Sequence, residues 1–138
     1  MMINDRMPEY CVERAMHILN RCKKALNGAK ILILGVAYKQ DVDDYRESPA
    51  IRVMEALQRH GAEASYYDPH VPSFKKGGRV TRGKAELTPE VVAIADLVIV
   101  TTAHTAVDYA LVQRHAKMVF DTKNAMKGIP DRGNIEVL

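Results

Sequence analysis

The segment that decides the fold is ILILGVAYKQDVDDYRESPA, residues 31–50. Four apolar residues run into Gly35, a polar loop with Lys39 and Arg46 follows, and Ser48 then opens an amphipathic segment. A short continuous apolar run before a helix is typical of a strand that is buried on both faces of a parallel sheet. No G-x-G-x-x-G pattern follows this strand, so the sequence does not predict the usual dinucleotide-binding turn at this point.

Strand and helix patterns alternate through the rest of the chain. Residues 73–84, with five basic side chains and three glycines, are predicted to form a loop. The alternation implies right-handed crossovers and a parallel sheet that is covered on both faces. We therefore predict an α/β fold, a three-layer sandwich with a mostly parallel sheet. Its further elements are predicted as strands at 64–67, 97–101, 118–121 and 135–138 and helices at 49–60, 87–94 and 106–115.

One long helix is predicted before this sheet. Apolar residues recur every three to four positions over residues 8–26, and Pro8 with the preceding Asn4-Asp5 resembles a helix start. Asn27-Gly28 is a typical helix stop. We therefore expect two parts, a helix within residues 1–28 and an α/β domain in residues 29–138.

Composition limits the function classes. The chain has 138 residues, of which 47% are hydrophobic and 27% charged, as in an ordinary globular domain. Its net charge of +3 is too small to predict binding to nucleic acid. The sequence has no apolar stretch of membrane-spanning length and no signal-peptide pattern, so a cytoplasmic protein is expected. Cys11 and Cys22 lie about 16 Å apart on one predicted helix, so both are expected to be free and buried.

The site is expected at the carboxyl ends of the strands, where ligands bind in open parallel sheets. The loops that follow the strands beginning at residues 31, 97 and 118 should meet there. Three cations, several hydroxyl or amide groups and an aromatic ring are what a diphosphate that carries a sugar and a base would require. The residues placed on this rim are Tyr38, Lys39, Arg46, Thr101, Thr102, His104, Asp121, Lys123 and Asn124.

The polar residues of the first loop have other interpretations. Lys39 could be a solvated loop side chain, and Arg46 could pair with Asp43, Asp44 or Glu47. The acidic residues of this loop lack the glycine and the bidentate ligand of a calcium loop, so no metal site is predicted.

Other candidate sites give weaker signals. The five histidines show no metal-ligand spacing, and His104 is expected to cap a turn. Asp68 is followed by a proline and is interpreted as a turn residue. The basic segment 75–84 lacks interleaved aromatic residues, so a solvated loop is favoured over a nucleic-acid site. No nucleophile–base pair, paired-carboxylate or Walker pattern is present, so no catalytic residue is predicted and the residues alone indicate a binding module.

Four motifs together resemble a known family. GVAYKQDVDDYRESPA at 35–50, with MPEY at 7–10, YYDPHVP at 66–72 and FDTKNA at 120–125, is similar to the C-terminal domain of the UDP-glucose/GDP-mannose dehydrogenase family. Among its members, the UDP-N-acetylhexosamine 6-dehydrogenases look closest. The resemblance implies a UDP-binding, Rossmann-like domain.

The resemblance also implies the setting of this domain. Family members oxidise the C6 alcohol of a nucleotide sugar to a carboxylate, which supplies UDP-uronic acids for surface polysaccharide precursors. NAD is bound mainly by an N-terminal domain, and a central helical region carries the catalytic cysteine and forms the dimer. This chain resembles the last part alone, with residues 1–28 as a connecting helix, so it is expected to be inactive in isolation. Its implied partners are a UDP-sugar and the other domains of a homo-oligomeric enzyme.

The family roles transfer to four residues. Lys39 corresponds to the lysine that contacts the UDP-sugar, and Tyr38 to the aromatic residue beside it near the uridine. Lys123 stands where many members have an arginine that binds the nucleotide. Arg46 corresponds to the arginine that reaches the NAD held by the other domain. The alternatives are a free-standing nucleotide-binding or interaction module and, more distantly, a CoA-binding or receiver-like α/β domain.

Overall fold

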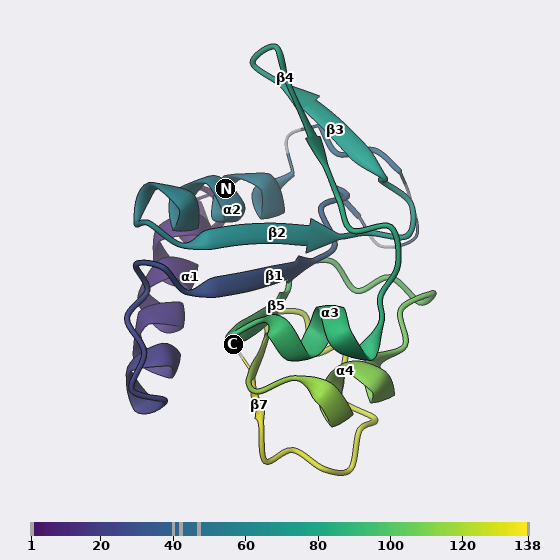
Figure 1. The fold of residues 1–138 in the computed structure, drawn as a ribbon. Coiled ribbons are helices and arrows are strands. Elements are labelled where there is room, and N and C mark those ends of the chain that lie inside the picture. Colours follow the sequence, from purple (N-terminus) through teal and green to yellow (C-terminus); the bar gives the residue numbers. More distant parts are fainter. Residues whose placement is uncertain (1, 40, 42, 47, 138) are drawn as a thin grey trace.

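The computed structural model describes residues 2–39, 41, 43–46 and 48–137, and the side chains from residue 8 onward. One long helix, a five-stranded sheet with three further helices, and a separate hairpin make up the fold (Figure 1). The elements are α1 (Met2–Arg21), β1 (Lys30–Leu34), α2 (Pro49–Arg59), β2 (Glu63–Tyr67), β3 (Ser73–Lys76), β4 (Arg79–Arg82), α3 (Pro89–Ile94), β5 (Leu97–Val100), α4 (Tyr109–His115), β6 (Val119–Asp121) and β7 (Ile135–Val137).

The sheet has the strand order β2-β1-β5-β6-β7, and all four neighbouring pairs are parallel. The chain leaves β1 toward β2 on one side and later returns to β5 on the other side. Strand order therefore reverses between β1 and β5, which is where ligands bind in this class of sheet. The predicted α/β fold with a mostly parallel sheet is confirmed.

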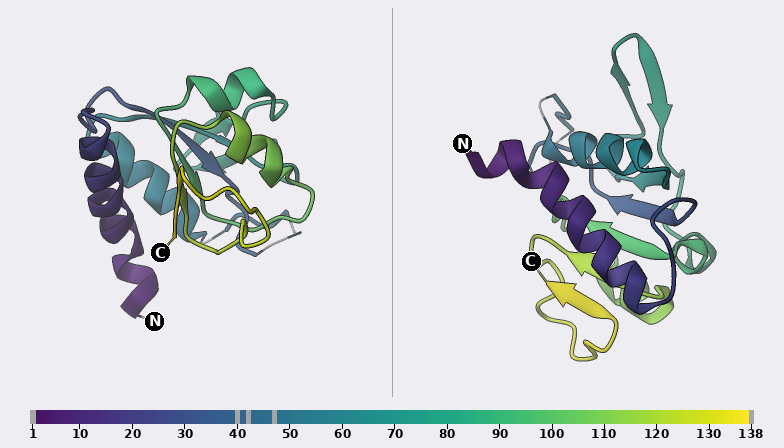
Figure 2. Two further views of the ribbon diagram at one scale, coloured as in Figure 1. Left: turned by 90° about the horizontal axis from the view of Figure 1, so that it is seen from below. Right: turned by 90° about the vertical axis from the view of Figure 1, so that its left-hand side faces the viewer.

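Helices cover both faces of this sheet. α1 and α2 lie on one face, and α3 and α4 lie on the other (Figure 2). Side chains of β1 alternate between these layers: Ile31 and Ile33 pack with α1 and α2, whereas Leu32 and Leu34 pack with the opposite helices. Such period-two alternation is what a strand buried on both faces produces. The structure is therefore the predicted three-layer sandwich.

The start of α2 follows the prediction closely. Ser48 is the N-cap, its hydroxyl oxygen accepts a hydrogen bond from the Ala50 backbone N–H, and Pro49 occupies the first turn. The predicted inward-facing residues, Ala50 and Leu57 among them, are buried. This cap fixes the point at which the loop after β1 returns to the core.

The end of α1 differs from the prediction, which extended the helix to Leu26. The Leu19 carbonyl accepts hydrogen bonds from the backbone N–H groups of Cys22 and Lys24, and Lys23 has a φ of 60°. This is the left-handed helix stop that glycine usually provides, so a lysine at this position did not indicate a helix end. Cys22 consequently lies beyond the helix and is exposed, and the prediction that it is buried was wrong.

The rest of α1 needs one further correction. Pro8 lies inside the helix, where it lacks one backbone N–H donor but does not mark the helix start. Cys11 is fully buried, as predicted, and this burial raises its pKa to about 11. α1 packs against α2 and its buried residues belong to the same core as β1.

Residues 73–84 are not a loop. β3 and β4 pair antiparallel through Gly77-Gly78, both with positive φ, as in the tight turn that suits a hairpin. Phe74 anchors this hairpin, because its buried ring packs against the rings of Tyr45 and Tyr66. Two glycines between short runs are a hairpin signal, but the many charges of those runs concealed it.

The two short helices begin directly after N-cap residues. α3 begins at Pro89 behind the cap Thr88, close to its predicted start, whereas α4 begins at Tyr109 behind the cap Asp108, later than predicted. Each cap side chain accepts a hydrogen bond from a backbone N–H three residues further on, which fixes the true start of the helix.

Candidate functional site

Loops at the carboxyl edge of the sheet border an open cavity of about 380 Å³. They follow β1, β5 and β6, so the cavity lies at the point where strand order reverses. The described residues that line it are Tyr38, Lys39, Thr101, Thr102, Ala103 and Lys123. The structure thus brings together five of the nine residues predicted for the rim.

The cavity is electropositive. Lys39 and Lys123 are the charged residues among its described lining, and both side chains are exposed. They come from opposite sides of β5, since one follows β1 and the other follows β6. Tyr38 is 52% exposed, which leaves much of its ring open to a ligand. Two ammonium groups and one aromatic ring suit an anion that carries a planar group.

The two threonines of the lining play a structural part. The Thr101 hydroxyl lies within hydrogen-bond distance of the Leu34 and Gly35 carbonyls, and the Thr102 hydroxyl donates to the Ala37 carbonyl at 2.9 Å. Each hydroxyl has one proton, so neither can donate to a ligand in this arrangement. Binding of an anion in the cavity therefore depends on the lysines.

Gly35 allows the loops after β1 and β5 to approach each other. Its φ is +95°, and a Cβ at this position would lie 2.4 Å from the Cβ of Thr102. The Leu34 carbonyl accepts hydrogen bonds from the backbone N–H groups of both Thr101 and Thr102. No side chain fits between these backbones, so glycine is required here.

Asp121 holds the loop that carries Lys123. It is fully buried, and its carboxylate accepts hydrogen bonds from the backbone N–H groups of Lys123, Ala125 and Met126 at 2.8–3.1 Å. The sequence placed Asp121 on the rim, but it lies beneath the rim because its oxygens are used by this turn. Asn124, also predicted for the rim, adopts a φ of 54° in the same turn and does not line the cavity.

A buried pair formed by Asp68 and His104 lies below the loop after β1. Both side chains are 0% exposed, and His104 Nε2 lies 2.8 Å from Asp68 Oδ2. The same oxygen accepts hydrogen bonds from the backbone N–H groups of Val36 and Ala37. Asp68 was interpreted as a turn residue; it does accept the N–H of His70, but it is also a buried acceptor for a second loop.

His104 lies buried below the rim on which it was predicted, and it does not line the cavity. Its Nδ1 accepts a hydrogen bond from the Asp41 backbone N–H at 2.7 Å, so it caps the loop after β1, in agreement with the expected capping role. Sequence reasoning missed the pair because its members are 36 residues apart. One signal in the sequence could have revealed the role of Asp68. An aspartate that directly follows a strand next to β1 lies near the backbone N–H groups of the loop after β1.

Hydrogen bonds lower the pKa of Asp68 despite its burial. Desolvation alone raises the pKa, but hydrogen bonds from the His104 ring and the backbone N–H groups of His70 and Val36 favour the charged form and outweigh it.

A carboxyl with a lowered pKa stabilises the fold above its unfolded-state pKa of about 3.9 and loses that contribution as the pH falls through the folded-state pKa. We therefore expect the stability difference between the native chain and Asp68→Asn to be constant from pH 7 to pH 5 and to shrink below about pH 4. Urea unfolding at several pH values measures it. A difference that grows on acidification would contradict the assignment.

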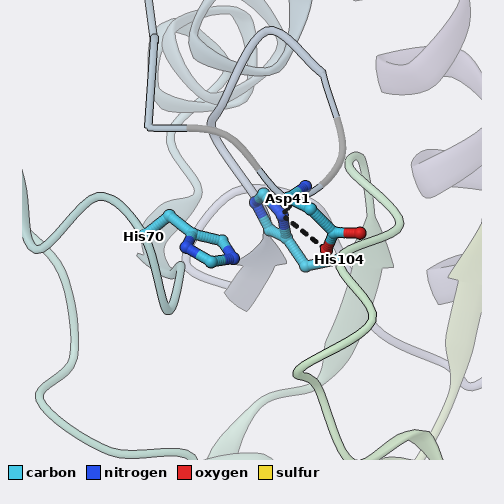
Figure 3. A group of neighbouring side chains, drawn as sticks. All are labelled: Asp41, His70 and His104. Atoms are coloured by element: carbon cyan, nitrogen blue, oxygen red, sulfur yellow. Dashed lines mark hydrogen bonds and ion pairs between the residues drawn. The ribbon is translucent and has the colours of Figure 1, made fainter.

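A metal site must also be considered, since Asp41, His70 and His104 each place one ligand atom within 4.8 Å of the others (Figure 3). The rings of the two histidines face each other edge-on, with centroids 4.7 Å apart. However, both nitrogens of His104 are engaged, with Asp41 N–H and with Asp68. A cation could bind Nδ1 only after the Asp41 N–H had moved away from it. The arrangement in the structure therefore favours a hydrogen-bonded network over a metal site.

Arg46 lies apart from the cavity. It lines a separate cavity of about 450 Å³ between the start of α2 and the β3–β4 hairpin, together with Arg52, Lys75 and Lys76 among others. Its guanidinium pairs with the Asp44 carboxylate at 3.1 Å, as one of the alternatives anticipated, and its side chain is 83% exposed. The hydrogen bonds from Arg46 lower the pKa of Asp44. Asp43 and Glu47 were the other candidate partners, and Glu47 lies outside the described residues.

Comparisons with known proteins agree with this arrangement. Residues 32–128 match the model of the UDP binding domain of the UDP-glucose/GDP-mannose dehydrogenase family. A UDP-N-acetyl-D-mannosamine dehydrogenase from Methanococcus maripaludis is 32% identical over 133 residues, which cover 91% of this chain and 29% of that protein. One from Pyrococcus horikoshii is 31% identical, with 93% and 29% coverage.

Solved structures give the same result. The UDP-N-acetyl-mannosamine dehydrogenase Cap5O from S. aureus superposes with a TM-score of 0.74 at 30% identity, covering 99% of this chain and 32% of that one. The UDP-D-ManNAc dehydrogenase from Pyrococcus horikoshii gives a TM-score of 0.76 at 27% identity, with 99% and 31% coverage.

The chain spans about 30% of the length of the curated relatives it matches. Among the described residues, no helix is both long and apolar enough to cross a membrane. The matched segment contains the cavity residues Tyr38, Lys39 and Lys123 as well as Arg46. On this evidence the chain belongs to the UDP-glucose/GDP-mannose dehydrogenase family and corresponds to its UDP binding domain.

Proposed function

We propose that this chain is the UDP-sugar-binding domain of an NAD-dependent dehydrogenase that oxidises the C6 alcohol of a nucleotide sugar to a carboxylate. Such an enzyme supplies UDP-uronic acids for surface polysaccharide precursors. The observation that carries this proposal is the electropositive cavity at the β1–β5 reversal, because it lies within the segment matched to the UDP binding domain. Relatives of this chain are named as UDP-sugar dehydrogenases.

Within the cavity the diphosphate would lie between Lys39 and Lys123, and the uracil ring would stack on Tyr38. Both threonine hydroxyls donate to backbone carbonyls, which leaves the two ammonium groups as the main charged contacts. A lysine at position 123 provides a point charge without the planar fork of an arginine. Binding of UDP to this domain is therefore expected to be weak.

The chemistry itself would take place on other parts of a longer enzyme. NAD would be held mainly by an N-terminal domain, and the catalytic cysteine would come from the central helical region. Energy gained by binding the UDP, far from the reacting C6, would position the sugar for oxidation. We assign no catalytic residue to this chain.

Arg46 would contact the NAD cofactor and not the UDP. It lines a cavity distinct from the one that Lys39 and Lys123 line (the lysine cavity), and its side chain is largely exposed, which suits a contact with a neighbouring domain. We propose that it reaches the NAD bound by that domain. Residues 1–28 would join residues 29–138 to the central region, in an enzyme that forms a homo-oligomer. A cytoplasmic location stays a prediction.

Titration calorimetry of the chain tests this proposal. We expect UDP to bind weakly but measurably, uridine to bind at least about tenfold more weakly because it lacks the diphosphate, and NAD to give no measurable heat. Tighter binding of NAD than of UDP, or equal binding of uridine and UDP, would contradict it.

A further inference from the structure

The loop that carries Tyr38 and Lys39 is anchored on both sides by one buried pair. On one side, the backbone N–H groups of Val36 and Ala37 donate to Asp68 Oδ2 at 2.8 and 3.1 Å. On the other side, beyond residue 40, the backbone N–H of Asp41 donates to His104 Nδ1 at 2.7 Å.

The protonation of His104 follows from its two partners. A backbone N–H faces Nδ1, so this nitrogen must offer a lone pair, and a carboxylate oxygen lies 2.8 Å from Nε2, so that nitrogen must carry the proton. Asp68 thereby fixes which nitrogen of His104 can accept from Asp41. The two anchors are thus not independent, since the carboxylate that holds the start of the loop also prepares the acceptor that holds its end.

The Asp41 side chain extends the same connection. Its Oδ1 accepts hydrogen bonds from the backbone N–H of Thr105 at 2.8 Å and from the Thr105 hydroxyl at 3.0 Å. The loop after β1 is therefore tied to the loop after β5, which supplies Thr101 and Thr102 to the cavity.

Neither member of the pair lines the lysine cavity. Both side chains are 0% exposed, so neither can touch a nucleotide bound there. A loop held at only one side would have to order Tyr38 and Lys39 at the moment of binding, and the loss of conformational entropy would weaken binding.

We propose that Asp68 and His104 are positioning residues that pre-order Tyr38 and Lys39 for nucleotide binding. This inference rests on the proposed function, because it takes UDP to be the ligand that the ordered loop binds. Ordering of the loop itself can be measured without any nucleotide.

Two substitutions of His104 separate its two contacts. His104→Asn keeps an oxygen acceptor near the Nδ1 position and loses the donor to Asp68, whereas His104→Gln can place its amide N–H near the Nε2 position and loses the acceptor for Asp41. We expect His104→Gln to weaken UDP binding about tenfold and His104→Asn to weaken it no more than about threefold. His60→Gln, a change at an exposed position, should leave UDP binding unchanged.

Hydrogen exchange of the Asp41 backbone amide measures the ordering of the loop without any nucleotide. We expect this amide to be protected from exchange in the native chain and in His104→Asn, and to lose its protection in His104→Gln. Equal losses of UDP affinity in both variants at matched stability, or an unprotected Asp41 amide in the native chain, would overturn the proposal. If the native chain shows the protection but does not bind UDP, the proposed function fails while the ordering of the loop stands.

The native chain alone provides a further test should the variants not fold. The nitrogen chemical shifts of the His104 ring should report a protonated Nε2 and an unprotonated Nδ1. The opposite tautomer would overturn the proposal. A change in UDP affinity after the chain has been treated with EDTA would also overturn it, because a metal ion bound at Nδ1 would then stand in place of the hydrogen bond.

Discussion

Replacement of Gly35 with alanine is expected to lower the free energy of unfolding by about 3 kcal/mol. Two costs combine: a positive φ at a residue with a Cβ, about 1–3 kcal/mol, and overpacking against Thr102, about 1–3 kcal/mol. The new methyl group would lie 2.4 Å from the Thr102 Cβ and 2.8 Å from the Thr102 carbonyl oxygen, so the two loops would have to separate. Urea unfolding monitored by circular dichroism measures the loss.

Gly128→Ala is the matched control for this prediction. A Cβ at Gly128 would meet no atom within 4 Å, and its φ is not in the left-handed region. We expect this variant to stay within about 0.5 kcal/mol of the native chain. A Gly35→Ala variant that is destabilised by less than about 1 kcal/mol would show that the close approach of the two loops is not required for stability.

Replacement of Lys39 with alanine is expected to weaken UDP binding about tenfold, with little effect on stability. A charge-assisted contact with a phosphate contributes about 1.5–3 kcal/mol, and exposure to solvent reduces this toward the lower value. The expected loss corresponds to about 1.4 kcal/mol. Calorimetric titration at fixed ionic strength measures it, and the difference from the native chain should narrow as salt is added.

Two other cations serve as controls for Lys39. Lys75→Ala removes an equal charge from the hairpin, and Arg46→Ala removes one from the second cavity. Because neither residue lines the lysine cavity, we expect both variants to bind UDP within about twofold of the native chain. In a longer enzyme that contains the NAD domain, Arg46→Ala should instead impair the use of the cofactor. Equal losses in all three variants would indicate general electrostatic attraction.

The sheet could be predicted because its physical signal is local. Runs such as 31–34 and 97–100 are apolar at every position, which is required of a strand covered on both faces, and their alternation with helical patterns dictates parallel pairing. The place of the cavity could be predicted from topology, since loops after neighbouring parallel strands must meet at one edge. Tyr38, Lys39 and Lys123 were predicted to lie there for this reason, and they line the cavity.

The features that were missed depend on contacts between distant residues or on unusual residues in common motifs. The pairing of Asp68 with His104 joins β2 and β5 across β1, and no spacing rule reveals it. The stop of α1 at Lys23 uses a conformation that lysine rarely adopts. Asp121 was predicted to lie on the rim, although its lone pairs serve the turn that presents Lys123.

The most direct test is to locate UDP on the folded chain by NMR titration. We expect the amide shifts to change most at Tyr38, Lys39, Thr101–Ala103 and Lys123, and those of the β3–β4 hairpin and the surroundings of Arg46 to change little. Changes centred on the hairpin and the start of α2, with residues 38 and 39 unaffected, would contradict it.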